Sequence, residues 1–270
     1  MAKTLFITGA STGIGRAAVD YFRDKGWNVA ATMRNPSDHT GLACSTVLTI
    51  ALDVTKPATI RPALDQALQA FGSIDVLVNN AGYGAFGPLE AASDEQIERE
   101  IATNVTGLML VTREIVPHFR ERASGVIINI SSVGGRATFP FYSLYHGTKW
   151  AVEGFSEALN FELAPFGIRV KVVEPGAIKT DFGSRSLDVL QKAGLTAYDD
   201  LLLKTREAWA GLRGVSGPEL VAEVIYNAAT DGTDQLRYIA GKDAEMVLDT
   251  RAKISQEEYY SLIRKRFGFA

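Results

Sequence analysis

The stretch TLFITGASTGIGRAAVDYFRDK, residues 4–25, decides the fold of this chain. A short apolar run ends at Gly9, Gly13 follows, and a helical pattern begins just after Gly15. The glycines allow a tight turn and a close backbone approach, and the helix N-terminus offers N–H groups to a pyrophosphate. The spacing Gly-x-x-x-Gly-x-Gly differs from the common Gly-x-Gly-x-x-Gly. Strand, glycine turn and helix in this order predict a nucleotide-binding βαβ unit rather than a plain glycine-rich surface turn.

Strand-like and helix-like segments alternate along the rest of the chain. Further strands are expected at 28–33, 47–52, 75–78, 125–130, 170–174 and 237–239. Helices are expected at 60–71, at 104–122, from Tyr145 to Ala164, and after Pro218. Apolar strands that alternate with amphipathic helices are typical of a parallel sheet covered on both faces. With no linker in the pattern, the sequence predicts one α/β domain over 1–270, a doubly wound parallel sheet of about seven strands.

Composition argues against several other classes of protein. A chain of 270 residues that is 46% hydrophobic and 22% charged can bury a core. Its formal net charge of −3 gives no electrostatic reason to expect nucleic acid as a partner. Cys44 is the only cysteine, and no Cys or His cluster surrounds it, so we expect neither a disulfide nor a metal site. No apolar run is long enough for a membrane span or a signal peptide, so a cytoplasmic location is expected.

Polar clusters follow the ends of four predicted strands. They are Ser11-Thr12, Asp53, Asn79-Asn80 and Ser131-Ser132. Each cluster alone could be a turn or a helix cap. Ligands of parallel sheets bind beyond the carboxyl ends of the strands, and all four clusters fall on that edge. We therefore expect a binding site there.

Tyr145 and Lys149 are four residues apart, so on a helix they lie one turn apart on one face. A free phenol has a pKa of about 10, and a nearby cation favours its ionised form. The pair is interpreted as a proton donor and acceptor tuned toward neutrality. The alternative is a tyrosine and a lysine on a solvated helix face.

Taken in order, these motifs resemble the short-chain dehydrogenase/reductase family along nearly the whole chain. The matching motifs are Thr8-Gly9-x-x-x-Gly13-x-Gly15, Asp53-Val54, Asn79-Asn80-Ala81-Gly82, Asn104, Ser132, Tyr145-x-x-x-Lys149 and Pro175-Gly176. The spacing from Ser132 to Tyr145, 145 − 132 = 13 residues, is also that of the family. The resemblance implies a Rossmann-like fold and an NAD(P)-dependent oxidoreductase that acts on CH–OH groups.

The resemblance implies a role for each residue of a Ser-Tyr-Lys site. Tyr145 would be the general acid/base, and Lys149 would lower its pKa and bind the nicotinamide ribose. Ser132 would hold the substrate oxygen, and Asn104 would anchor a water-linked proton path from Lys149 to solvent. Hydride transfer to a carbonyl develops an alkoxide, which needs a hydrogen-bond donor and a proton. Ser132 and Tyr145 would supply both in one place.

The cofactor implied by the resemblance would lie along the same edge of the sheet. Asp53 would accept from the adenine amino group, and Asn80 would lie along the adenosine ribose. The Ile178 backbone and Thr180 would contact the nicotinamide carboxamide. The full set of expected cofactor-binding residues is Gly9, Ser11, Thr12, Gly13, Ile14, Gly15, Arg34, Asp53, Val54, Asn80, Ala81, Gly82, Tyr145, Lys149, Pro175, Gly176, Ile178 and Thr180.

The end of the second strand indicates which nicotinamide cofactor is used. An NAD site usually has Asp or Glu about 20 residues after the glycine turn, where it binds the ribose 2′-OH. Here Met33 and Arg34 stand near that distance from Gly15, and neither is a carboxylate. The guanidinium of Arg34 suits a 2′-phosphate, so we expect NADP(H) rather than NAD(H). The alternative is a solvated Arg34 that pairs with Asp38.

Two stretches depart from the family pattern or add to it. His146 and Gly147 stand where the family usually has Ser, Ala or Cys. Residues 183–214 form a leucine-rich insertion, interpreted as a pair of amphipathic helices that cover the site as a lid. The insertion and nearby aromatic residues favour an apolar substrate. Those aromatic residues are Tyr83, Phe86, Phe139, Phe141 and Tyr142.

The leading hypothesis is therefore an NADP-dependent enzyme that interconverts an alcohol and a ketone or aldehyde on a small-molecule substrate. One alternative is a cofactor-sensing regulator of the same fold, which would be expected to lack Tyr145 or Lys149. Another is a nucleotide-sugar epimerase or dehydratase, whose glycine spacing differs and which has a separate C-terminal substrate domain. The resemblance also suggests a homodimer or homotetramer.

Overall fold

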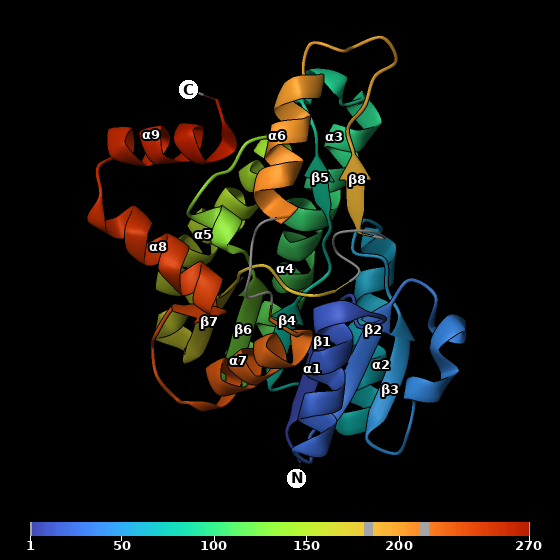
Figure 1. Cartoon of the computed structure of the whole chain (residues 1–270). Helices are drawn as coiled ribbons and strands as arrows, with labels where there is room; N and C mark the ends of the chain where they lie inside the picture. The colour runs from blue at the N-terminus through green and yellow to red at the C-terminus, as the bar shows by residue number, and fades with distance from the viewer. Residues whose placement is uncertain (1, 181–185, 211–215, 270) are drawn as a thin grey trace.

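A seven-stranded parallel sheet forms the centre of the computed structural model, which describes residues 2–180, 186–210 and 216–269 (Figure 1). Across the sheet the strands follow the order β3 (Val47–Ala51), β2 (Asn28–Met33), β1 (Thr4–Ile7), β4 (Val76–Asn79), β6 (Gly125–Ile130), β7 (Ile168–Pro175) and β9 (Arg237–Ala240). The chain moves outward from β1 to β3 and then returns to β4 on the other side of β1. Ligands of open parallel sheets bind at such a reversal, beyond the carboxyl ends of the strands.

Helices cover both faces of this sheet. On one face lie α1 (Gly13–Asp24) and α7 (Pro218–Thr230), and on the other lie α2 (Ile60–Phe71), α4 (Leu108–Glu121) and α5 (Ser143–Leu163). Successive side chains of a strand point to opposite faces. In β1, Leu5 and Ile7 accordingly join the apolar core of the first face, whereas Phe6 joins that of the second. The predicted doubly wound α/β sheet is confirmed.

The predicted strands at 28–33 and 125–130 and the predicted helix at 60–71 match the observed elements residue for residue. The predicted helix at 104–122 is wrong at its start. There the chain forms α3 (Asp94–Ile101), then a π-helical segment (Ala102–Gly107), then α4. α3 begins at a capping box, in which Ser93 Oγ accepts from the Gln96 N–H and Gln96 Oε1 accepts from the Ser93 N–H.

The leucine-rich insertion contains one helix in its described part, residues 186–210, rather than the predicted two. α6 (Asp199–Ala210) is that helix, and β8 (Leu187–Val189) precedes it. β8 pairs in parallel with β5 (Gly84–Phe86) and forms a second, two-stranded sheet beside α3 (Figure 1). Residues 183–185 and 211–214 of the predicted insertion lie outside the described residues.

The C-terminal part consists of α8 (Lys242–Lys253) and α9 (Gln256–Phe267). α9 packs near α6, and its last turn carries Arg264, Lys265 and Arg266. None of the described helices is long and apolar enough to cross a membrane. Within the described ranges, no group of His, Cys, Asp and Glu side chains could hold a metal ion.

Candidate active site

The glycine turn between β1 and α1 favours glycine either through its backbone conformation or through lack of space. Gly9 and Gly13 have φ angles of 66° and 56°, which L residues rarely adopt. A Cβ at Gly15 would clash with the Gly9 carbonyl oxygen and lie 2.6 Å from Asn80 Nδ2. The side-chain amide of Asn80 donates to the carbonyls of Thr8 (2.9 Å) and Gly9 (3.0 Å). Because Asn80 directly follows β4, these two hydrogen bonds fix the glycine turn to the end of that strand.

α1 begins directly at this turn, and its N-terminus suits an anion. Thr12 occupies the N-cap position, yet its side chain caps no N–H group among the described residues. The first turn carries no acidic residue that would repel a phosphate. Unpaired N–H groups and the positive end of the helix dipole are what a pyrophosphate requires, so these residues fit the expected dinucleotide.

Asn104 lies in the π-helical segment and is only 2% exposed. Its Oδ1 accepts from the Tyr83 N–H (3.1 Å), and its Nδ2 donates to the Tyr83 carbonyl (2.8 Å) and to Thr148 Oγ1 (3.1 Å). π-Helical turns occur frequently at functional sites. This side chain fastens the turn after β4 to helix α5, which carries Tyr145 and Lys149.

Tyr145, Lys149 and Ser132 come together at the carboxyl end of β6. Lys149 Nζ lies 5.7 Å from the centre of the Tyr145 ring and donates to the Ile130 carbonyl (2.9 Å). Ser132 Oγ accepts from the Gly134 N–H (3.0 Å), and the Ser132 side chain hydrogen-bonds to Tyr145. A Cβ at Gly82 would lie 3.0 Å from Asn104 Oδ1 and 3.8 Å from Lys149 Nζ, so the amide and the ammonium border one small space.

Burial governs the electrostatics of this pair. Tyr145 and Lys149 are both 8% exposed. Burial raises the pKa of Tyr145 above its ordinary value, although the hydrogen bond from Ser132 opposes this rise. Burial lowers the pKa of Lys149 to about 8. Desolvation of the phenol therefore sets the direction in which the pKa of Tyr145 departs from its ordinary value.

The loop after β7 carries the Pro175-Gly176 motif, and sequence reasoning missed the residue that fixes it. Asp243, near the start of α8, accepts from the Ala177 N–H through Oδ2 (2.6 Å). A Cβ at Gly176 would clash with this carboxylate. A Cβ at Gly13 would lie 3.5 Å from Thr180, so the loop reaches the glycine turn. The glycine turn and the loop after β7 therefore lie next to each other at the carboxyl edge of the sheet.

Arg34 and Asp53 lie at neighbouring strand ends. Arg34 is exposed and follows the last residue of β2. It forms no ion pair within the described parts of the chain, so the alternative pairing with Asp38 is not observed. Asp53 accepts from the N–H (3.0 Å) and the hydroxyl (2.7 Å) of Thr55, as a turn residue does. Partial burial favours the neutral form of Asp53, but these hydrogen bonds from Thr55, together with positive charge on Lys56 and Arg34, hold its pKa below its ordinary value.

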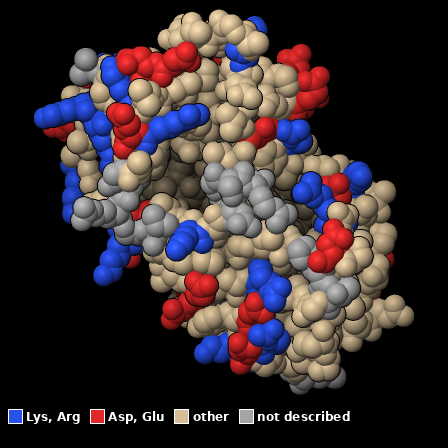
Figure 2. Space-filling model, turned by 45° about the vertical axis from the view of Figure 1, so that its right-hand side comes forward, with Lys and Arg blue, Asp and Glu red and all other residues tan. Residues whose placement is uncertain are grey.

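Aromatic side chains border the site on the side of α6. The Tyr142 ring lies 5.0 Å from the Phe86 ring and 6.2 Å from the Tyr145 ring. Beyond Phe86 is a hollow of about 400 Å³ between β5, β8 and α6. Its lining is Phe86, Gly87, Pro88, Ala91, Val189, Leu190, Gln191, Lys192, Leu195, Asp199, Leu202, Leu203 and Arg206. Figure 2 shows a deep hollow near the centre of the molecule.

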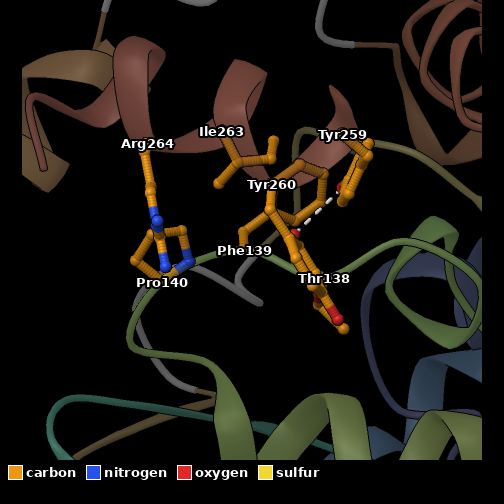
Figure 3. Close-up of a pocket in the computed structure, with 7 residues that line it drawn as sticks. All are labelled: Thr138, Phe139, Pro140, Tyr259, Tyr260, Ile263 and Arg264. Carbon is orange, nitrogen blue, oxygen red and sulfur yellow. Dashed lines mark hydrogen bonds between the residues drawn. The ribbon is translucent and has the colours of Figure 1, made fainter. Parts of the chain in front are cut away.

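A second hollow, of about 330 Å³, lies between the loop that leads into α5 and helix α9 (Figure 3). The Tyr259 hydroxyl donates to the Thr138 carbonyl (3.0 Å) beside it, and Phe139 lies between the two elements. The N–H of Phe139 in turn donates to Nε2 of the buried His146 (3.0 Å). His146, which departs from the family pattern, thus holds the aromatic loop against the helix of Tyr145.

Comparisons with known proteins agree with this geometry. The model of the short chain dehydrogenase family matches residues 3–189. An uncharacterized oxidoreductase of Schizosaccharomyces pombe is 40% identical over 240 residues, which are 87% of this chain and all of that protein. A 3-ketodihydrosphingosine reductase of Bacteroides thetaiotaomicron is 39% identical over 180 residues, 67% of this chain and 65% of that protein.

Solved structures agree as well. A short-chain dehydrogenase from Streptomyces avermitilis superposes with a TM-score of 0.85 at 33% identity, covering 100% of this chain and 98% of that one. The structure of ElxO with NADP bound has a TM-score of 0.73 at 27% identity, covering 88% of this chain and 98% of that one.

Proposed function

Because the chain belongs to the short-chain dehydrogenase family, we propose that it interconverts an alcohol and a ketone or aldehyde with NADP(H) as hydride carrier. The observation that carries the proposal is the junction of Ser132, Tyr145 and Lys149 at the carboxyl end of β6. That junction adjoins a glycine turn and a helix N-terminus that fit a dinucleotide. The matching ElxO structure with bound NADP and the matching reductase support the same chemistry.

In the proposed reduction, each side chain acts on the substrate oxygen or on its proton. Ser132 donates a hydrogen bond to the carbonyl oxygen and stabilises the negative charge that develops there. Tyr145 gives its phenolic proton to that oxygen. A dinucleotide held at the glycine turn and the N-terminus of α1 would supply the hydride. Lys149 stabilises the phenolate that remains. Burial raises the pKa of Tyr145, which keeps the phenol protonated at neutral pH, the form that reduction requires.

The alternatives receive less support. A regulator that only senses the cofactor would have no use for a buried Tyr145 beside Lys149 and Ser132, all of which are present. An epimerase or dehydratase of nucleotide sugars would need a separate substrate domain, and the described chain instead forms one α/β unit. Residues 186–210, the described part of the insertion, border the hollow beside Phe86, and we assign them to a substrate lid.

Arg34→Ala tests the choice of NADP(H). The loss of a guanidinium that binds a 2′-phosphate should weaken NADPH by ~1.5–3 kcal/mol, or about 10- to 150-fold in Kd, and leave NADH nearly unchanged. Calorimetric titration of both cofactors measures this without a substrate. Arg61→Ala, an exposed arginine on α2, is the matched control. Equal losses for both cofactors would show that Arg34 does not contact the phosphate.

A carbonyl screen tests the substrate class. Leucine side chains of the insertion line the hollow beside Phe86, together with the charged residues Lys192, Asp199 and Arg206. We expect bulky apolar ketones to be reduced with higher kcat/KM than short charged keto acids, because such ketones can pack against those leucine side chains. Leu202→Ala should raise the activation free energy for the bulky ketones by about 1–3 kcal/mol, which lowers their kcat/KM. The kcat/KM for small ketones should stay nearly unchanged. Oxidation of NADPH measures both. Short keto acids that surpass every hydrophobic ketone would contradict this assignment.

A further inference from the structure

Asp243, in the first turn of α8, contacts the loop after β7, and the mechanism above gives it no role. Its Oδ2 accepts from the Ala177 N–H at 2.6 Å. Its Oδ1 is buried and has no hydrogen-bond partner among the described residues. Taking a carboxylate oxygen out of water without giving it a partner costs free energy. The placement of this side chain therefore calls for an explanation.

Two glycines leave the space that the Asp243 carboxylate occupies. A Cβ on Gly176, at the start of the loop, would clash with both carboxylate oxygens. A Cβ on Gly241, just before α8, would lie 2.7 Å from Oδ1, which is closer than atoms in contact approach. The carboxylate is therefore packed directly against the backbone of both glycines, and a larger residue at either position would displace it.

Helix α8, which carries Asp243, is held in place by contacts of its own. Ala244 and Leu248 are buried, and Leu248 packs in an apolar cluster with Ala137 and Tyr259. These contacts lie on α8 itself and do not involve the loop after β7. Loss of the Asp243 carboxylate should therefore release the loop and leave the helix where it is.

Backbone hydrogen bonds hold other parts of the same loop. The Gly176 N–H donates to the Ala240 carbonyl (3.0 Å), the Lys179 N–H to the Ser216 carbonyl (2.8 Å), and the Ser216 N–H to the Ala177 carbonyl (3.2 Å). The Ala177 N–H lies between these attachments and donates to a side chain instead. Asp243 thus supplies the acceptor for an N–H in the middle of the loop.

The loop that Asp243 holds continues to the glycine turn. A Cβ on Gly13 would lie 3.5 Å from Thr180, and the side chain of Ile178 packs against the apolar core on the face of α1. Ile178 and Thr180 are the residues expected to contact the nicotinamide carboxamide. Because Ala177 directly precedes Ile178, the position of its peptide N–H helps to set where these two residues lie relative to the glycine turn.

We propose that Asp243 is a positioning residue for the nicotinamide half of the cofactor, an inference that rests on the proposed function. By binding the Ala177 N–H, its carboxylate holds Ile178 and Thr180 in place and so restricts the movement of the nicotinamide. The adenosine half is expected near the ends of β2 and β3, at the edge of the sheet opposite to β9 and Asp243. Its binding does not depend on this carboxylate.

Two substitutions of Asp243 test the proposal without a substrate. Asp243→Ala removes the acceptor and should raise the Kd of NADPH ~10- to 30-fold. Asp243→Asn keeps an acceptor in the same place and should remain within ~3-fold of wild type. Adenosine 2′,5′-bisphosphate has no nicotinamide, so its Kd should be the same in all three proteins. Titration calorimetry measures every one of these values.

Glu245→Ala is the matched control. Glu245 is exposed and is the other acidic residue in the first turn of α8, so this variant loses the same favourable interaction with the helix dipole. It should keep the wild-type Kd of NADPH. A loss of NADPH affinity in Glu245→Ala equal to that in Asp243→Ala would assign the effect to the helix rather than to the contact with Ala177.

Gly176→Ala tests the space that the carboxylate fills. The added methyl group should raise the Kd of NADPH in the wild-type background, because it collides with the Asp243 carboxylate. In the Asp243→Ala background that carboxylate is gone, so the same methyl group should raise the Kd by a smaller factor. Equal factors in the two backgrounds would contradict the contact.

The rate of hydride transfer tests the consequence for the reaction. At saturating NADPH with a carbonyl substrate, Asp243→Ala should lower the single-turnover rate ~10- to 100-fold, because a loosely held nicotinamide is seldom aligned with the substrate. Asp243→Asn should recover most of that rate. A full rate in Asp243→Ala at saturating NADPH would overturn the positioning role.

The binding results separate this inference from the proposed function. If wild type binds NADPH and reduces a carbonyl compound while Asp243→Ala binds NADPH equally well, Asp243 does not position the nicotinamide. Equal losses for NADPH and the bisphosphate would also overturn the inference, because they would indicate a general disturbance of the fold. If NADPH binding depends on Asp243 as expected but no carbonyl compound is reduced, the proposed function alone is contradicted. A wild type that binds no NADPH would contradict both.

Discussion

Replacing Tyr145 by phenylalanine is expected to lower kcat for carbonyl reduction by ~10²–10⁴-fold, the usual contribution of a general acid. The change removes one hydroxyl and its proton and keeps the ring, which packs against Tyr142 and His146. The Kd of NADPH should change little, because the glycine turn and the loop after β7 are untouched. Single-turnover oxidation of NADPH, with calorimetry for cofactor binding, measures both quantities.

Tyr142→Phe is the matched control for that experiment. Tyr142 lies three residues before Tyr145, and its ring contacts Phe86 and Tyr145. It has no lysine one turn further along the helix, since His146 stands there. This variant should keep kcat within a few-fold of wild type. If Tyr145→Phe retained more than about a tenth of the rate, another group would have to be the proton donor.

Ser132→Ala is expected to have the next largest effect, a loss of ~10²–10³-fold in kcat, as found for donors to a developing oxyanion. The Ser132 side chain hydrogen-bonds to Tyr145, so its hydroxyl is placed to bind the same substrate oxygen that receives the proton. The substitution also removes the hydrogen bond from the Gly134 N–H, so the melting temperature should be measured alongside the rate.

The neighbouring serine gives this prediction its control. Ser131 is 3% exposed, and its hydroxyl has no hydrogen-bond partner among the described residues. Ser131→Ala also removes a serine hydroxyl, at the position before Ser132, and should leave kcat near the wild-type value. Equal losses for the two variants would point to disturbed packing at the end of β6 rather than to a direct role of Ser132.

The strands of the parallel sheet could be predicted because local patterns specify them. The strand at 125–130, GVIINI, is apolar apart from Asn129, and burial on both faces of a parallel sheet favours such a nearly continuous apolar run. The helix at 60–71 shows a clear apolar stripe and ends at Gly72, which has a positive φ of 79°. The resemblance then indicated Ser132, Tyr145 and Lys149, which the structure brings together.

Features that depend on distant contacts could not be predicted. β8 is only three residues long and becomes a strand because β5 lies beside it. Asp243 and Gly176 are 67 residues apart (243 − 176 = 67), and only the folded chain reveals their contact. Glu100 has neighbours of both charges in sequence, so it resembles a solvated residue until α3 packs against α5. The raised pKa of Tyr145 likewise depends on burial that no spacing reveals.

The pairing of β5 with β8 also sets an order of events during folding. Gly84 and Leu187 are 103 residues apart (187 − 84 = 103), and closing so long a loop costs about 4 kcal/mol of chain entropy. A two-stranded ribbon of three residue pairs is too small to offset that cost alone. The central sheet must first hold both ends near each other. We therefore expect this wall of the hollow beside Phe86 to assemble last and to open first, without unfolding of the core.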